Sequence, residues 1–150
     1  MRSLVTRVLA AYLLAASVFV LASCQLGGNS MLTSNDTLDK GLVSIIDSKD
    51  EPVPLTSLTD FEWDEFGFAT EGTTADDIKR VFGERIIKDN RYSSSTNLFV
   101  FKKDGAVIHA IMVSVDYFDA DEALTLYSDE VTIGFRETTA RPDLLHFVDE

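Results

Sequence analysis

The amino terminus determines how much of this chain is available to fold. Residues 1–7 carry two arginines and no acid, residues 8–20 form an apolar run of 13 residues, and small residues follow. A bilayer span needs about 20 apolar residues, so this run is too short to be one. A basic start, a short apolar run and small residues are the three parts of a secretory signal peptide. We therefore expect residues 1–23 to be removed, which leaves 127 residues.

The residues around the expected cleavage point are Leu21-Ala22-Ser23-Cys24. They resemble the lipobox of bacterial lipoproteins in sequence and in position. The resemblance implies cleavage between Ser23 and Cys24, a diacylglycerol on the Cys24 thiol and a further acyl chain on its amino group. Two or three acyl chains anchor a protein stably without a transmembrane helix, at about 0.8 kcal/mol per buried CH2. An ordinary signal peptide with an incidental Cys24, or an uncleaved anchor, is the alternative.

The residue after the lipobox indicates which membrane would hold the protein. In lipoproteins of two-membrane bacteria, Asp directly after the Cys commonly signals retention in the inner membrane, and here the residue is Gln25. The resemblance therefore implies a cell-envelope protein on the outer membrane, facing the periplasm, if the host has two membranes.

Charge and cysteine content exclude several classes of function. The formal net charge is −12, and it becomes −14 once the two arginines of residues 1–23 are removed. An acidic surface argues against nucleic acid, whose phosphates require clustered Lys and Arg, and against attraction to anionic headgroups. One cysteine excludes an internal disulfide framework and a cysteine-based zinc site.

Composition along the chain divides the mature protein into three parts. Residues 24–54 are predicted to be the lipidated terminus and a flexible tether, because polar and small residues dominate and two prolines follow. Residues 55–136 are predicted to form the folded domain, and residues 137–150 a C-terminal tail.

Local patterns predict the elements of that domain. An aromatic segment over 61–68 predicts a strand with a kink at Glu65, and Thr73 or Thr74 is expected to cap a helix over 75–82 that ends at Gly83. Asp104-Gly105 predicts a hairpin between strands over 98–101 and 106–115. In the second of these strands, Val107, His109, Ile111, Val113 and Val115 are expected to share one face. A short helix over 121–127, capped by Asp119, and a strand over 131–135 complete a two-layer α+β domain, with one or two short helices on a small antiparallel sheet.

The order Gly72-Thr73-Thr74, Ile78, Gly83, polar loop and hairpin resembles small envelope lipoproteins of the SmpA/OmlA (BamE) kind. It is also similar to the repeat of beta-lactamase-inhibitor-protein-like domains. Those families usually have a proline near the glycine that ends the helix, where this chain has Glu84-Arg85. The aromatic segment and the lysine-bearing hairpin also resemble a set of small bacterial lipoproteins.

No motif indicates catalysis. The only histidines are His109 and His146, and neither a Gly-x-Ser-x-Gly motif nor a phosphate-binding glycine loop is present. Clustered acids are expected to be solvated, and Asp119-Ala120-Asp121-Glu122 lacks the glycine turn and distal Glu of a calcium loop. We expect a non-enzyme with neither a cofactor nor a metal.

The remaining expectation is an anchored protein that binds another protein. The predicted interaction surface is Glu62, Trp63, Asp64, Glu65 and Phe66, because aromatic side chains anchor interfaces and acidic ones steer a basic partner. The alternative is a periplasmic inhibitor or immunity protein directed against a cell-wall enzyme or toxin.

Overall fold

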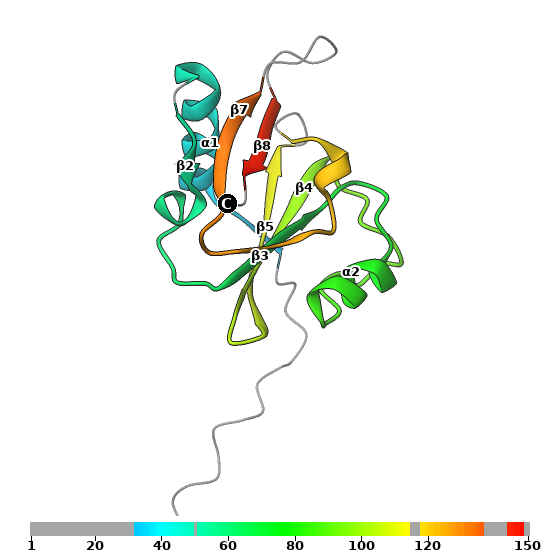
Figure 1. Ribbon diagram of the computed structural model, residues 1–150. Coiled ribbons are helices and arrows are strands. Elements are labelled where there is room, and N and C mark those ends of the chain that lie inside the picture. The colour runs from blue at the N-terminus through cyan, green and yellow to red at the C-terminus, as the bar shows by residue number, and fades with distance from the viewer. Residues whose placement is uncertain (1–31, 50, 115–117, 137–143, 149–150) are drawn as a thin grey trace, which may run out of the picture.

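The structure, a computed structural model, describes residues 32–49, 51–114, 118–136 and 144–148 (Figure 1). Within these ranges the helices are α1 (Asp36–Ser48), α2 (Ala75–Phe82) and the 3-10 turns η1 (Leu55–Leu58) and η3 (Ala120–Glu122). The strands are β1 (Leu32–Ser34), β2 (Val53–Pro54), β3 (Glu65–Ala69), β4 (Thr96–Lys103), β5 (Ala106–Ser114), β6 (Leu126–Ser128), β7 (Thr132–Arg136) and β8 (Leu144–Val148). This is an α+β fold.

A five-stranded sheet in the order β1-β5-β4-β3-β6 forms the centre of the molecule. Its three central strands are antiparallel, as the Asp104-Gly105 turn predicts, and Gly105 takes a φ of 78° there. The edge strand β1 pairs in parallel with β5, placing Leu32 opposite Ala110. The sheet is therefore mixed, whereas an antiparallel sheet was expected.

A second, three-stranded antiparallel sheet in the order β2-β7-β8 packs against the first. Its β8 edge is covered rather than open. Leu145 forms a parallel bridge with Phe118, and the Phe147 amide donates a hydrogen bond to the Glu122 carboxylate at 3.1 Å. Arg136 lies 3.4 Å from the Asp119 carboxylate and 3.9 Å from that of Glu122, which holds the covering segment in place. Such cover prevents an unpaired edge from joining other chains.

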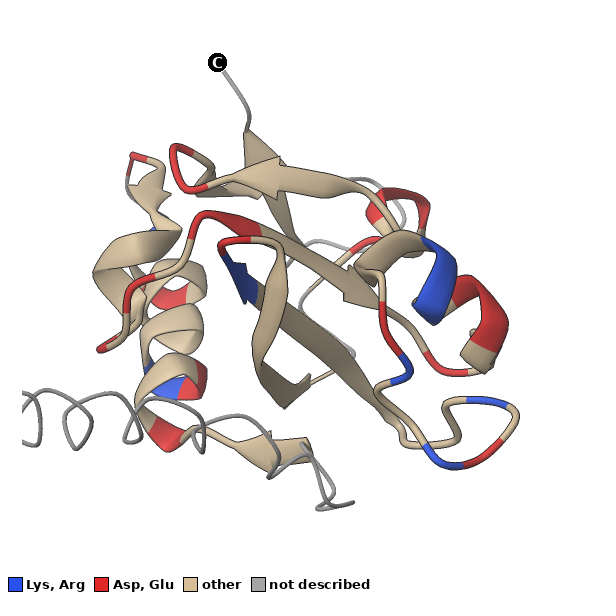
Figure 2. Ribbon diagram, turned by 90° about the horizontal axis from the view of Figure 1, so that it is seen from below, with Lys and Arg blue, Asp and Glu red and all other residues tan. Residues whose placement is uncertain are grey.

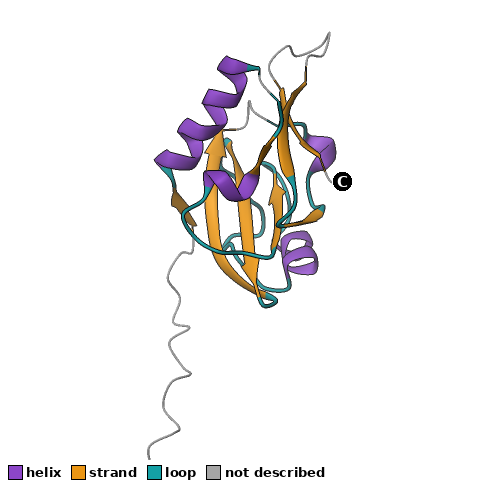
Figure 3. Cartoon of the chain, turned by 60° about the vertical axis from the view of Figure 1, so that its left-hand side comes forward, coloured by secondary structure: helices purple, strands orange, loops and turns teal. Residues whose placement is uncertain are grey.

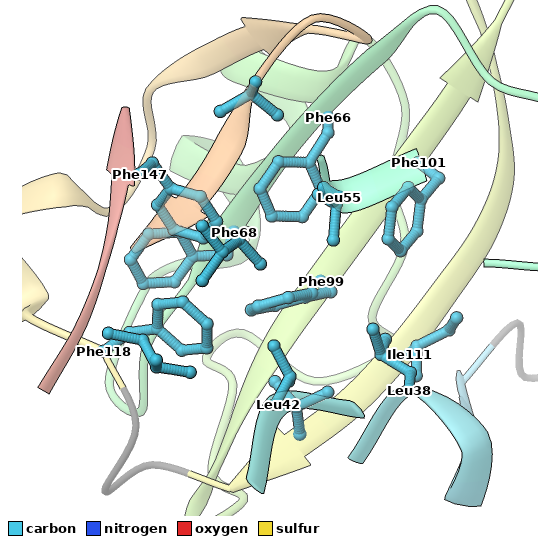
Figure 4. Close-up of a cluster of buried hydrophobic side chains, with 14 of the residues drawn as sticks. Leu38, Leu42, Leu55, Phe66, Phe68, Phe99, Phe101, Ile111, Phe118 and Phe147 are labelled. Atoms are coloured by element: carbon cyan, nitrogen blue, oxygen red, sulfur yellow. The ribbon is translucent and has the colours of Figure 1, made fainter. Parts of the chain in front are cut away.

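Phenylalanine fills the space between the two sheets (Figure 4). Phe66 and Phe68 of β3 and Phe99 and Phe101 of β4 all point to this side, because alternate residues of a strand share a face. Phe147 of β8 reaches them from the second sheet, with ring centroids 5.1 Å from Phe66 and 5.5 Å from Phe68. The aromatic packing therefore joins the two sheets.

The other face of the five-stranded sheet packs against α2 and the loop after it, so α1 and α2 lie on opposite sides of the strands (Figure 3). Gly67 permits this close approach: a Cβ there would lie 2.9 Å from the Phe82 ring and 2.5 Å from the Thr125 carbonyl oxygen. The domain thus has three layers, where two were predicted.

The prediction for helix α2 is confirmed. Thr74 caps its start, with the hydroxyl oxygen accepting the Asp77 amide at 3.1 Å, and Gly83 ends it at a φ of 89°. Ile78 and Phe82 are fully buried on its sheet-facing side. Hydrogen bonds from Thr74 and Arg80 lower the pKa of the Asp77 carboxyl, which therefore stays charged at the positive end of the helix.

The predicted tether is wrong from Leu32 onward. Asn35 caps the 13-residue helix α1 by accepting the amides of Thr37 and Leu38, each at 3.0 Å. Leu38, Leu42 and Ile45 then recur at spacings of four and three residues and are buried against the phenylalanine cluster. Of the predicted tether, residues 24–31 and residue 50 lie outside the described residues.

Three further expectations are corrected. The predicted tail contains β8, whose Leu145 is fully buried. The aromatic strand begins at Glu65 rather than at 61, and the helix expected over 121–127 is only the turn η3, although Asp119 does cap it. The strand expected over 131–135 is present as β7.

The prediction of which face of β5 each residue occupies is wrong for Val107. His109 pairs with Phe101 and Val107 with Lys102, so Ile108 is an extra residue in the ladder. Because of this bulge, side chains before Ile108 point to the opposite face from the one that simple alternation predicts. Val107 therefore joins the cluster under α2, while Ile111 and Val113 join the phenylalanine cluster. Val115 lies outside the described residues.

The burial of α1 predicts that substitutions at two neighbouring residues of this helix change the free energy of unfolding by very different amounts. Leu42 is fully buried and Val43 is 37% exposed. Leu42→Ala should lower the free energy of unfolding by about 2–5 kcal/mol, because it leaves a cavity in the core. Val43→Ala should change it by less than about 1 kcal/mol. Urea denaturation of the mature chain measures both values, and equal small effects would contradict the placement of α1.

Candidate interaction surface

Two residues of the predicted interaction surface lie in the core. Trp63 is 3% exposed and Phe66 is not exposed at all. The Trp63 ring packs 5.4 Å from that of Phe101, and its Nε1 donates a hydrogen bond to the Thr59 hydroxyl at 3.1 Å. These aromatic side chains stabilise the fold and are not available as anchors for a partner.

The three carboxylates of the predicted surface hold residues 62–65 against the β4–β5 hairpin. Glu65 pairs with Lys102 at 2.6 Å and Glu62 with Lys103 at 3.3 Å. The Asp64 carboxylate accepts the amide of Asp104 at 2.7 Å. The lysines balance part of the charge, so this region is not the purely acidic patch that the sequence suggested.

A hollow of about 260 Å³ lies elsewhere, between α1 and the β2–η1 segment. It is smaller than the pockets of roughly 300–1,000 Å³ that hold drug-sized ligands, so it fits one or two side chains rather than a whole cofactor. We call it the α1 groove. Its lining residues are Gly41, Ser44, Ile45, Ser48, Glu51, Val53, Ser57 and Leu58.

The shape of the α1 groove depends on a glycine in the middle of α1. A Cβ at Gly41 would lie 2.8 Å from the Leu58 Cδ2 atom, so glycine allows η1 to pack closely against the helix. Ser57 holds the turn by donating its hydroxyl proton to the Pro54 carbonyl at 2.7 Å.

The groove combines apolar walls with hydroxyl groups and one charge. Ile45, Val53 and Leu58 supply apolar surface and three serines supply hydroxyls. Among the described residues of its lining, Glu51 is the one that carries a charge. A carboxylate beside hydroxyl acceptors favours a positively charged group, while the apolar walls favour an aliphatic stem. Lysine and arginine side chains have both properties.

Neither histidine is among the residues that line the groove. The His109 ring packs against that of Phe61, with centroids 4.1 Å apart and planes tilted by 42°, and His146 packs over Gly134. His146 is thus part of a strand rather than of a tail. Within the described residues, no three His, Cys, Asp or Glu side chains are grouped as a metal site would require. Ser23 and Cys24 lie outside the described residues.

The sequence contains a signal for helix α1, which forms one wall of the groove, but the overall composition of residues 24–54 does not reveal it. Asn35 is a favoured helix cap, and Leu38, Leu42 and Ile45 follow at helical spacing. Reading residues 24–54 by their overall polarity hid this short apolar stripe, and with it the helix that forms one wall.

Comparisons with known proteins found no matching family profile, no similar curated protein and no matching solved structure. The likeness to SmpA/OmlA and inhibitor-protein repeats therefore stays a prediction. Among the helices in the described part of the chain, none has both the length and the hydropathy of a membrane span.

Proposed function

We propose that this chain is a lipid-anchored bacterial cell-envelope protein whose domain binds another protein and catalyses no reaction. The α1 groove carries the proposal, because it is a side-chain-sized hollow whose described residues place the Glu51 carboxylate in a mixed apolar and hydroxyl lining. Its partner would insert a lysine or arginine side chain. The net charge expected of the mature chain, −14, would steer such a basic segment toward the domain.

The anchor follows from Cys24 and the lipobox that precedes it. The mature protein would begin at this lipidated cysteine, on the outer membrane if the host has two membranes. The first strand begins at Leu32, so the folded domain follows the anchor closely.

Replacing Cys24 tests the anchor. Full-length protein should be found in the membrane fraction and should incorporate labelled fatty acid, because Cys24 carries the acyl chains. Cys24→Ser should incorporate none and should leave the membrane fraction. Val43→Ala, which keeps the lipobox, serves as the control and should behave as wild type. Identical labelling and partition of Cys24→Ser and wild type would refute the anchor.

A photo-crosslinking side chain placed in turn at two adjacent positions of α1 tests the groove. Ser44 lines the hollow and exposed Val43 does not. In cells, position 44 should give a discrete adduct and position 43 should not, because the partner side chain occupies the hollow.

Two charge reversals identify the carboxylate involved. Glu51→Lys should abolish the adduct, whereas Glu62→Lys, the same change on a side chain that is 91% exposed and outside the groove, should not. Loss with Glu62→Lys alone would contradict the groove and favour the surface predicted from sequence. An adduct with a single enzyme whose activity is blocked would identify the inhibitor or immunity class; one with envelope components would identify an accessory protein.

A further inference from the structure

The segment that forms the α1 groove contains an excess of acidic residues. Residues 36–62, which include α1, β2 and η1, contain seven acidic and two basic residues. Residues 71–91, which include α2, contain five of each. In Figure 2 red predominates on α1, the longer helix at the left, and on the segment that follows it. Charge complementarity therefore favours a cation as the occupant of the groove.

The end of the groove beside Ser48 has two features that favour positive charge. Ser48 is the last residue of α1, and Glu51 lies three residues further along the chain. The C-terminal end of a helix carries the negative end of its dipole, and the last turn of α1 contains no basic residue. Lys49, the residue after the helix, places its Nζ over the Phe135 ring, 4.7 Å from the centroid. Phe135 does not line the groove.

The serine hydroxyls of the groove are oriented to accept hydrogen bonds from a ligand. Ser57 donates its hydroxyl proton to the Pro54 carbonyl oxygen at 2.7 Å, and Ser48 donates its own to that of Ile45 at 3.5 Å. A hydroxyl group has one proton and two lone pairs, so a proton given to the backbone leaves lone pairs for a ligand. Such a lining suits a hydrogen-bond donor and disfavours an anion.

The rest of the groove offers apolar surface for the stem of such a cation. Gly41 and Ser48 are separated by a rise of about 10 Å along α1. Ile45 lies between them in the helix, and Leu58 packs at the Gly41 end. A cation bound beside Ser48 and Glu51 can therefore lay an aliphatic stem along the groove toward Leu58.

The positions of the acceptors favour an ammonium group over a guanidinium group. Ser48 belongs to α1 and Glu51 to the segment that leads into β2, so a bound cation meets acceptors from two elements. The three protons of an ammonium group point in different directions, whereas those of a guanidinium lie in one plane. Arginine is favoured where acceptors match that plane or an aromatic ring stacks on it, and none of the described residues in the lining is aromatic.

We propose that the α1 groove selects a lysine side chain, with the ammonium group held at the end formed by Ser48 and Glu51 and the stem directed toward Leu58. This inference rests on the proposed function, because it names the group that the partner protein inserts. Glu51 supplies the opposite charge, and the Ser48 hydroxyl accepts a proton of the ammonium group.

Three small probes test this selection on the full-length protein in micelles of an uncharged detergent. They are the Nα-acetyl N-methylamides of lysine, arginine and norleucine, of which the last has an aliphatic stem without a charge. In nuclear magnetic resonance titrations, the lysine probe should shift the backbone amide signals of Ser44 and Ser48. It should bind at least about fivefold more tightly than either other probe, because it alone matches both the apolar walls and the acceptors.

A neutral replacement of the groove carboxylate provides the matched control. Glu51→Gln should weaken binding of the lysine probe about fivefold, because it removes the charge and keeps the shape of the side chain. Glu62→Gln, the same change on a side chain that is 91% exposed and outside the groove, should leave binding unaltered. Equal binding of the arginine or norleucine probe would overturn the proposal, and so would the absence of a shift at Ser48 with the lysine probe.

Failure of the proposed function gives a different result. Selective binding of the lysine probe, with no adduct from position 44 in cells, would refute the protein partner and leave the lysine site intact. An adduct from position 44 that is lost with Glu51→Lys, together with equal binding of the lysine and arginine probes, would support the protein partner and overturn the selection of lysine.

Discussion

The packing of phenylalanine between the two sheets is the interaction on which the rest of this fold depends. Fully burying a phenylalanine side chain contributes about 1.5–3 kcal/mol, and Phe66, Phe68, Phe99 and Phe101 are all fully buried on one face of the central sheet. That face needs a cover. Helix α1 supplies one side of it, and β8 supplies the other through Phe147, whose ring stacks on that of Phe118 at 4.9 Å. Segments that look peripheral by composition are therefore required by the core.

The sequence predicted those elements whose signals are local. Helix α2 has its capping residue, its apolar face and its terminal glycine within ten residues, and the hairpin has Asp104-Gly105 between two apolar runs. The α+β class follows from these patterns. Helix α1 was missed because its three buried residues are diluted by polar neighbours, and β8 because its partner β7 is separated from it in sequence. The bulge at Ile108 was missed because only pairing with β4 reveals it.

The candidate site was harder to predict than the fold. Aromatic residues such as Trp63 and Phe66 occur both in interfaces and in cores. Only their burial in the structure distinguishes the two roles. The carboxylates beside them proved to hold a hairpin. The α1 groove depends on contact between Gly41 and Leu58, which belong to elements that the sequence did not pair.

Together, these features describe a domain whose central sheet is covered on one face by α2 and on the other by α1 and the second sheet. The central claim is that residues 32–48 belong to the fold, because α1 covers part of the core and forms one wall of the groove. Native-state hydrogen exchange tests it most directly. The amides of Leu42 and Ile45 in α1 should open with nearly the same free energy as those of Phe99 and Phe101 in β4, because one core holds both. Exchange of the α1 amides at rates close to those of an unstructured chain, with β4 protected, would contradict the account.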